Sequence, residues 1–317
     1  MSLGTNKAQP YRTNKRHKLL SAIWSHKLLY LLMLPALVYY IIFRYVPIYG
    51  LSISFKDYNP GLGIIKSPWA EPWFKYYLQF FTSPYFVRLI SNTVTLSSLK
   101  IVFGMIFPIT LALLLNDCQS KYLKRTVQTL TYMPHFLSWV VIYGILLAFF
   151  SQSTGVVNNL LSKAGHPTIP FLISNAWFRQ IVVLSDIWQS AGWSAIIYLA
   201  AMSGIDPNLY EASRIDGVGR MGQIRHITIP CIINTIILLL ILKIGTIMDA
   251  GFDQIYNIYS VQVYPVGDII DTWVYRTGLL QMNFSLATAV GLFKAIIGFG
   301  LVLSSNLLAR RWGSGLW

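Results

Sequence analysis

The residues best suited to mechanical work in this 317-residue chain lie in one polar stretch, GIDPNLYEASRIDGVGRMGQIRHITIP, at positions 204–230. Asp206 is a good N-cap and Pro207 suits the first helical position, so we expect a short helix from Pro207 to about Asp216. Gly217 stands where helices often end in a left-handed residue, and a second helical stretch is expected after it. A helix, a sharp bend and another helix make a compact element that a second protein could hold.

Motifs for catalysis or metal binding are absent from the sequence. It contains no nucleotide-binding GxxxxGK[ST], no zinc-binding HExxH and no nucleophile GxSxG. We therefore expect a chain that is not an enzyme and that holds no metal or cofactor of its own. The two cysteines, Cys118 and Cys231, do not predict a disulfide framework.

Several charged residues fall inside or near the ends of apolar segments, where charge is costly and usually faces protein or a wet cavity. These residues are Lys100, Lys243, Lys294, Asp186 and Asp249. The three lysines could form a positive passage that attracts an acidic polymer. They could equally pair with aspartates or extend to a membrane interface. Lys243 and Asp249 lie on different faces of a helix, so we do not expect that pair.

Aromatic and amide side chains near the segment ends could bind sugars, by ring stacking and by hydrogen bonds to hydroxyl groups. The candidates are Asn92, Trp188, Trp193, Tyr198 and Tyr256. The competing interpretation is that the aromatic residues anchor the chain at a membrane interface.

Composition predicts a membrane protein. Hydrophobic residues make up 55% of the chain and charged residues 11%, whereas a soluble domain has about 25% charged residues. Because roughly 20 helical residues cross a bilayer, the chain has room for about six crossings. The predicted spans are about 28–53, 87–115, 132–150, 181–203, 231–252 and 284–308. We expect an all-α membrane protein in which a basic arm, residues 1–27, precedes a transmembrane domain, residues 28–317.

Basic residues predict the orientation of these spans, because Lys and Arg concentrate on the cytoplasmic side. Within the arm, the following residues all precede the first acidic residue: Lys7, Arg12, Lys15, Arg16, Lys18 and Lys27. Further basic residues lie in the 116–131 and 204–230 loops and at Arg310 and Arg311. Both termini are therefore predicted to be cytoplasmic. This distribution explains the formal charge of +14 by orientation and contact with anionic lipid, without invoking nucleic acid.

The full spacing of the 204–230 stretch resembles the EAA motif of binding-protein-dependent ABC importer permeases, EAAxxxGx₉IxLP. Here Glu211, Ala212 and Ser213 precede Gly217 by the required interval, and Ile227-Thr228-Ile229-Pro230 completes the pattern. Ser213 and Ile229 replace an alanine and a leucine of the motif, and both replacements are mild in size. The resemblance implies a type I importer permease fold in which this loop is a coupling helix that docks on an ATPase. The implied coupling residues are Glu211, Ala212, Ser213, Arg214, Asp216 and Gly217.

Most of the chain resembles the polysaccharide and complex-oligosaccharide permeases, and within them the alginate-importer subunits. The stretches that carry this resemblance are 46–60, 83–93, 128–141, 187–207, 268–294 and 314–317. The resemblance implies a heterodimer with a second permease in a bacterial inner membrane. It also implies two ATPase subunits that bind ATP and Mg, and an extracytoplasmic binding protein that meets the loops at about 54–86, 151–180 and 253–283.

Three other functions compete with this interpretation. An ion-driven secondary carrier would leave the 204–230 loop unexplained. A membrane glycosyl- or phosphotransferase would need clustered acidic or histidine residues at one membrane face, and we find no persuasive cluster. An ABC permease for peptides or amino acids is compatible with the loop and is disfavoured only by the subfamily resemblance.

Overall fold

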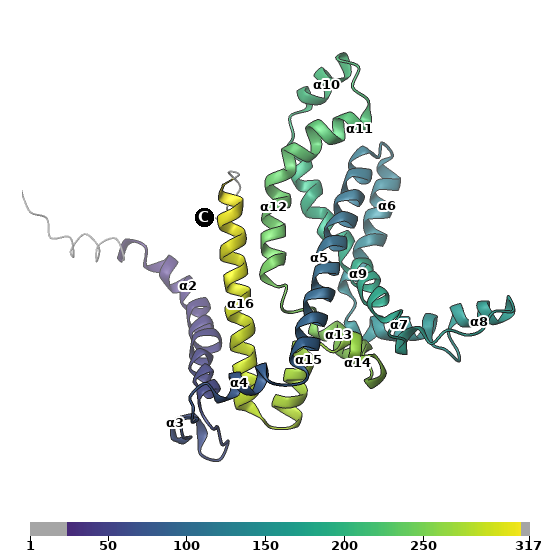
Figure 1. The fold of residues 1–317 in the computed structure, drawn as a ribbon. Coiled ribbons are helices and arrows are strands. Elements are labelled where there is room, and N and C mark those ends of the chain that lie inside the picture. The colour runs from purple at the N-terminus through teal and green to yellow at the C-terminus, as the bar shows by residue number, and fades with distance from the viewer. Residues whose placement is uncertain (1–23, 312–317) are drawn as a thin grey trace, which may run out of the picture.

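A computed structural model describes residues 24–311, and within them regular structure is helical apart from one isolated β-bridge between Lys56 and Trp69. Most of the basic arm, residues 1–23, and the tail 312–317 lie outside the described residues. Figure 1 shows long helices running roughly alongside one another, with short helices at both ends. An all-α chain is therefore confirmed over the described part.

Four long segments are apolar and long enough to cross a bilayer. They are Lys27–Phe55, Phe86–Asp117, Arg220–Gly245 and Phe284–Arg310. The first comprises α2 (Lys27–Tyr40), the π-helical η1 (Ile41–Tyr45) and the 3-10 helix η2 (Val46–Phe55); the second and fourth are α5 (Phe86–Asp117) and α16 (Phe284–Arg310). The third comprises α11 (Arg220–Gln223), the π-helical η5 (Ile224–Thr228) and α12 (Ile229–Gly245).

The fourth predicted span is α9 (Phe178–Ser203), which has 26 residues but carries Arg179, Asp186 and Gln189 and is less apolar than the others. The fifth ends earlier than the predicted residue 252. α12 stops at Gly245, and a turn leads through Ala250 and Gly251, both with positive φ, into α13 (Phe252–Ile258).

The prediction of one continuous helix over 132–150 as the third span is wrong. The structure has α6 (Lys121–Tyr132) and the 3-10 turn η3 (Met133–Phe136), then α7 (Trp139–Phe150), and the two helical pieces meet at 107°. Pro134 has no amide hydrogen to continue a helix. The Ser138 side chain then accepts a hydrogen bond from the Val141 amide, as the N-cap of a new helix. Residues 121–131, expected in a loop, are therefore helical.

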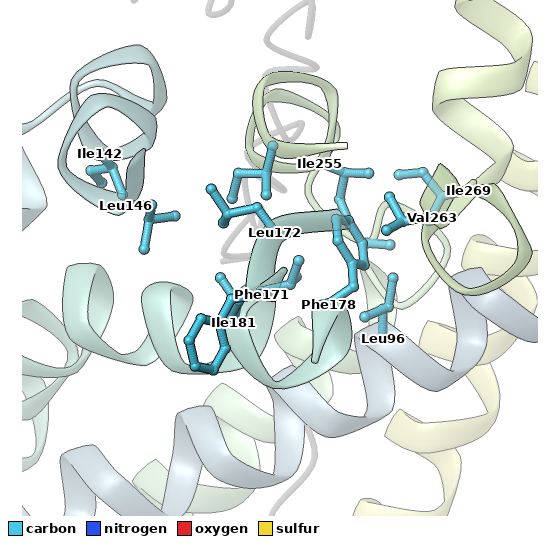
Figure 2. Close-up of a cluster of buried hydrophobic side chains, with 13 residues drawn as sticks. Leu96, Ile142, Leu146, Phe171, Leu172, Phe178, Ile181, Ile255, Val263 and Ile269 are labelled. Atoms are coloured by element: carbon cyan, nitrogen blue, oxygen red, sulfur yellow. The ribbon is translucent and has the colours of Figure 1, made fainter. Parts of the chain in front are cut away.

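The largest buried cluster lies where α5, α7, α9 and α13 approach one another (Figure 2). Leu96, Ile142, Phe178 and Ile255 are fully buried within it. Burial of such side chains contributes roughly 1.5–3 kcal/mol each. This cluster holds the bent α6–α7 segment against the long helices.

Short helices gather at the two ends of the bundle. At one end lie α3 (Gly63–Lys66), α4 (Lys75–Phe81) and α15 (Ile270–Tyr275), the last followed by the π-helical η7 (Arg276–Leu280). On that side α7 also leads into α8 (Val156–Lys163), and α14 (Tyr264–Gly267) follows α13. At the opposite end lies α10 (Pro207–Ile215), and Figure 1 shows that the C-terminal end of α16 points the same way.

Helix α2 stands apart from the bundle in Figure 1, and none of its residues is buried. Only its continuation, η2, packs along α16. Its apolar sequence, KLLYLLMLPALVYY, therefore presents an uncovered hydrophobic surface to lipid or to another chain.

We predict that Gly192→Ala destabilises the fold by about 1–3 kcal/mol. Gly192 of α9 packs so closely on α6 that a Cβ atom would overlap the backbone carbonyl of Thr131. Gly144→Ala is the matched control, because nothing lies within 4 Å of a Cβ added there. Thermal unfolding of the detergent-solubilised protein should show a lower midpoint for the first variant only. Equal midpoints would contradict the close packing of α6 on α9.

Candidate functional site

The 204–230 loop has the local structure that its sequence predicts. Helix α10 runs over Pro207–Ile215, and the Asp206 side chain accepts a hydrogen bond of 2.9 Å from the Asn208 amide. Pro207 occupies the first turn, where a missing amide hydrogen has no consequence. The start of this helix is thus fixed by Asp206 and Pro207 alone.

The end of α10 is fixed by a left-handed glycine. Gly217 has φ of +74°, as predicted, and two hydrogen bonds close the turn: the Val218 amide donates to the Ser213 carbonyl at 2.9 Å and the Gly217 amide to the Arg214 carbonyl at 3.1 Å. This pair of bonds is a Schellman motif. A side chain at position 217 would meet no neighbour within 4 Å, so the requirement for glycine is conformational.

A set of polar side chains, which we call the loop brace, joins α10 to the helices that follow it. The brace consists of Tyr210, Ser213, Gln223 and Thr228. The Gln223 amide donates to the Ser213 hydroxyl at 2.8 Å, and the Tyr210 and Thr228 hydroxyls lie 2.9 Å apart. Ser213 is buried and donates to the Tyr210 carbonyl at 2.8 Å. Ser213 is therefore packed within the loop and is not part of its outer surface.

The outward face of α10 remains uncovered. Glu211 and Ala212 are exposed, and Ile215 is 88% exposed. Arg214 and Asp216 are also exposed, and neither forms an ion pair with any other described residue.

A cavity of about 310 Å³ lies between α10 and the end of α5, lined in part by Glu211, Arg214 and Asp117. Arg220 binds Asp117 at 3.0 Å, which ties the loop to the end of α5. The loop therefore has an exposed face that is both apolar and charged. The Arg220–Asp117 pair holds it to α5, and the loop brace holds it to the segment that continues into α12.

Two of the three intramembrane lysines pair with aspartates of the same chain. Lys100 lies 3.6 Å from Asp186 and donates to the Ala250 carbonyl at 2.8 Å. Lys294 contacts Asp249 at 2.5 Å and Asp271 at 2.6 Å. Of the alternatives that the sequence leaves open for Lys100 and Lys294, the structure therefore shows pairing with aspartates.

Lys243 donates to the Gly104 carbonyl at 2.9 Å and, as expected, does not pair with Asp249 in the described chain. A cavity of about 760 Å³ is lined by Lys294 together with Asp249, Asp253 and Asp271. These lysines therefore do not supply an excess of positive charge to this cavity.

The sugar-binding candidates divide into buried and accessible residues. Tyr198 is 1% exposed inside a hydrophobic cluster and cannot reach a substrate without rearrangement. Trp188 is 46% exposed, and Trp193 is 45% exposed and stacks on His135 with ring centroids 4.7 Å apart. Tyr256 stacks on Phe252 with ring centroids 5.3 Å apart and is 40% exposed, beside the cavity of about 760 Å³. The three accessible rings remain candidates.

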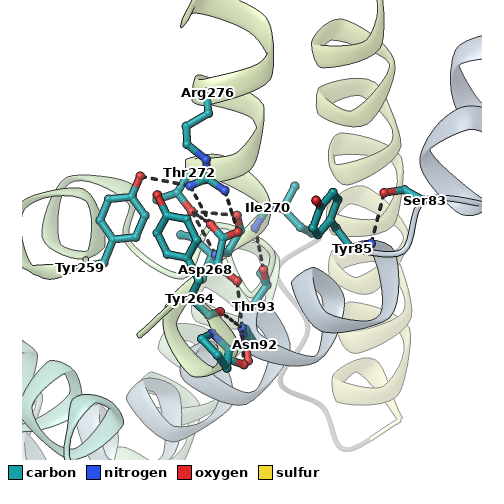
Figure 3. Close-up of polar contacts among 12 residues, drawn as sticks. Ser83, Tyr85, Asn92, Thr93, Tyr259, Tyr264, Asp268, Ile270, Thr272 and Arg276 are labelled. Atoms are coloured by element: carbon teal, nitrogen blue, oxygen red, sulfur yellow. Dashed lines mark hydrogen bonds and ion pairs between the residues drawn. The ribbon is translucent and has the colours of Figure 1, made fainter. Parts of the chain in front are cut away.

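Asn92 belongs to a structural network that the sequence did not predict (Figure 3). It is 2% exposed, its amide donates to the Asp268 carbonyl at 3.0 Å, and its oxygen accepts from Arg179 at 2.9 Å. Thr93 accepts a hydrogen bond from the Ile270 amide at 3.0 Å. Asn92 therefore fastens α5 to the segment around α14 and is unavailable to a sugar.

The centre of this network is an ion pair between Asp268 and Arg276. Asp268 is fully buried, and both of its carboxylate oxygens receive the guanidinium group, at 2.9 and 2.7 Å. Burial lowers the pKa of Arg276, but the hydrogen bonds and charge of Asp268 act the other way and raise it overall. Asp268 and Arg276 are eight residues apart, beyond the three- or four-residue spacing of helical side-chain pairs, so no local signal in the sequence identified them.

Comparison with known proteins agrees with this architecture. The family described as "Binding-protein-dependent transport system inner membrane component" matches residues 101–314. The polygalacturonan/rhamnogalacturonan transport system permease YteP of Bacillus subtilis is 43% identical over 303 residues, covering 96% of this chain and 94% of its own. LplB of the same organism is 43% identical over 293 residues, covering 92% of each chain.

A solved bacterial ABC transporter involved in the import of the acidic polysaccharide alginate contains a chain with a TM-score of 0.86 and 41% identity. The match covers 93% of this protein and 99% of that chain. A chain of the methionine transporter MetNI, at 16% identity and a TM-score of 0.52, shares the fold alone. The protein belongs to the binding-protein-dependent transport system inner membrane component family, the permeases of ABC importers.

Proposed function

We propose that this permease is one of two transmembrane subunits of an ATP-driven importer for oligo- or polysaccharides, with an acidic polymer such as alginate preferred. The observation that carries the proposal is the match, at 41% identity over 93% of the chain, to a subunit of an alginate importer. YteP, whose name gives polygalacturonan and rhamnogalacturonan, is similar to nearly the same extent. Polygalacturonan and alginate are both polymers of uronic acids, so the shared feature is a carboxylate on each sugar.

The subunits that accompany this chain follow from its uncovered surfaces and its family. A second permease would cover apolar surface such as that of α2, which no part of the described chain buries. Two ATPase subunits, with their own ATP and Mg, would complete the importer, and one of them would dock at α10, whose outward face is exposed. A binding protein would meet the opposite end, around α3, α4 and α15; a related alginate importer has been solved with an alginate pentasaccharide-bound periplasmic protein.

The membrane orientation is part of the same proposal. If α10 meets an ATPase, its end of the bundle is cytoplasmic, and the C-terminal end of α16 lies on the same side (Figure 1). The basic arm would begin there too, at the inner membrane of a bacterium.

The mechanism is alternating access driven through α10. Closing of the ATPase dimer displaces α10, and the loop brace passes the displacement to α12 through Gln223 and Thr228. Arg220 passes it to α5 through Asp117. The long helices then reorient, and the passage opens alternately to each side. This chain contributes position and movement, and the partner subunits carry out hydrolysis.

We predict that Ile215→Glu abolishes stable binding of the ATPase subunits. Ile215 is 88% exposed on α10, and its apolar side chain suits a cleft from which a charge would be excluded. Ile65→Glu is the matched control, because Ile65 is 78% exposed on α3 at the other end. The measurement is the ATPase-to-permease ratio after purification on a permease tag. Undiminished ATPase in the Ile215→Glu sample would refute docking at α10.

We also predict that uronate oligosaccharides stimulate the ATPase activity of the reconstituted complex at about tenfold lower concentration than neutral oligosaccharides of equal length. A tenfold difference corresponds to about the free energy of binding that one charge-assisted hydrogen bond contributes. Uptake should depend on ATP and persist when ion gradients are collapsed. Preferential stimulation by neutral sugars or peptides would reject the acidic substrate, and uptake driven by an ion gradient would reject the importer itself.

A further inference from the structure

A third cavity, of about 420 Å³, opens at the end of the bundle opposite α10, between the start of α5 and the segment from α14 to η7. This volume lies within the range of small-ligand pockets, about 300–1,000 Å³. It is lined by Gln79, Ser83, Tyr85, Arg88, Tyr264, Trp273, Arg276, Thr277, Gln281, Asn283 and Leu286. None of these described residues carries a carboxylate and two carry guanidinium groups, whereas the 760 Å³ cavity is lined by more carboxylates than lysines.

Arg276 is held rigidly at this cavity. Its guanidinium group donates two hydrogen bonds to the Asp268 carboxylate and one to the Tyr259 hydroxyl, at 3.1 Å for the latter. The same group lies 4.5 Å from the centre of the Tyr264 ring. Figure 3 shows the side chain extending from η7 toward Asp268, with Tyr259 and Tyr264 beside it. Because Asp268 balances its charge, Arg276 offers orientation and hydrogen-bond donors rather than unpaired charge.

Arg88 supplies the uncompensated charge. It forms no ion pair with any other residue from 24 to 311, and its guanidinium lies 5.2 Å from the centre of the Tyr85 ring. Its Nε atom is buried and has no hydrogen-bond partner among the residues that the structure describes. A buried donor without a partner is costly, and such groups are normally satisfied by a ligand or another molecule.

The rest of the lining matches a sugar that carries a carboxylate. Two arginines can bind a carboxylate through parallel hydrogen bonds. The amides of Gln79, Gln281 and Asn283 can donate to and accept from hydroxyl groups. The Tyr85 ring, beside Arg88, supplies an apolar surface next to the charge. An acidic side chain of a binding protein would use the arginines but would not need the amides or a cavity of this size.

We propose that this cavity is a uronate subsite at the outer entrance of the permease, in which Arg88 binds the sugar carboxylate and Arg276 orients it. The inference rests on the proposed function and assigns the recognition of acidic substrate to these arginines rather than to the paired lysines. The subsite would receive a sugar unit as the polymer leaves the binding protein.

The test compares Arg88→Gln, Arg88→Lys and the control Lys66→Gln in the reconstituted complex with its binding protein. Lys66 is an exposed cation on α3 at the same end of the bundle and forms no ion pair in the described chain. With alginate pentasaccharide as the probe, Arg88→Gln should reduce stimulated ATPase activity and uptake about tenfold. Arg88→Lys should retain an intermediate activity, and Lys66→Gln should match the unmodified protein.

A second measurement, the affinity of the complex for sugar-free binding protein, separates a sugar subsite from a protein contact. Unchanged affinity in Arg88→Gln supports the subsite, and an affinity loss as large as the activity loss overturns it. Wild-type activity of Arg88→Gln with the pentasaccharide overturns the subsite alone. Failure of the pentasaccharide to stimulate the unmodified complex overturns the proposed function and the subsite with it.

Discussion

The hydrogen bonds of the loop brace are the interaction on which the proposed role of this protein depends. A helix of nine residues outside a bilayer has little stability by itself. Here α10 is capped by Asp206 at one end and by Gly217 at the other, and Gln223 ties its buried Ser213 to the segment that continues into α12. In the proposed mechanism, movement imposed on α10 would therefore reach the long helices with little loss in the loop. A flexible loop in the same place would absorb that movement.

Charge within the bundle obeys a second constraint, because an uncompensated charge in a low-dielectric region is strongly unfavourable. Lys100 and Lys294 each lie near an aspartate from another helix or turn, and Asp268 is buried against Arg276. The lysine–aspartate pairs join different helices or turns, so they help to specify how the helices assemble. Charge that remains available for an anionic substrate therefore has to be sought at the ends of the bundle, where water can enter.

The parts of the structure that depend on local rules were predictable. Asp206, Pro207 and Gly217 fix the start, first turn and end of α10 through backbone geometry, so reading neighbouring residues was sufficient. The bend between α6 and α7 was missed, because apolar composition over 132–150 concealed the break at Pro134. Ser138, four residues later, was the available signal, since its side chain caps the new helix. Sequence alone makes Asn92 a candidate sugar ligand, because its partner, the Asp268 carbonyl, lies 176 residues away and leaves no local pattern.

Rigidity of the loop through the ATP cycle can be measured with spin labels at Asn208 and Arg225, two exposed residues on either side of Gly217. Pulsed electron paramagnetic resonance on the assembled importer gives the distance between the labels in the nucleotide-free and ATP-bound states. We expect one narrow distribution, unchanged by nucleotide, and a broader one with reduced uptake when Gln223→Ala removes the brace. A distance that changes with nucleotide in the unmodified protein would show that the loop bends during the cycle, and the account of force transmission would be wrong.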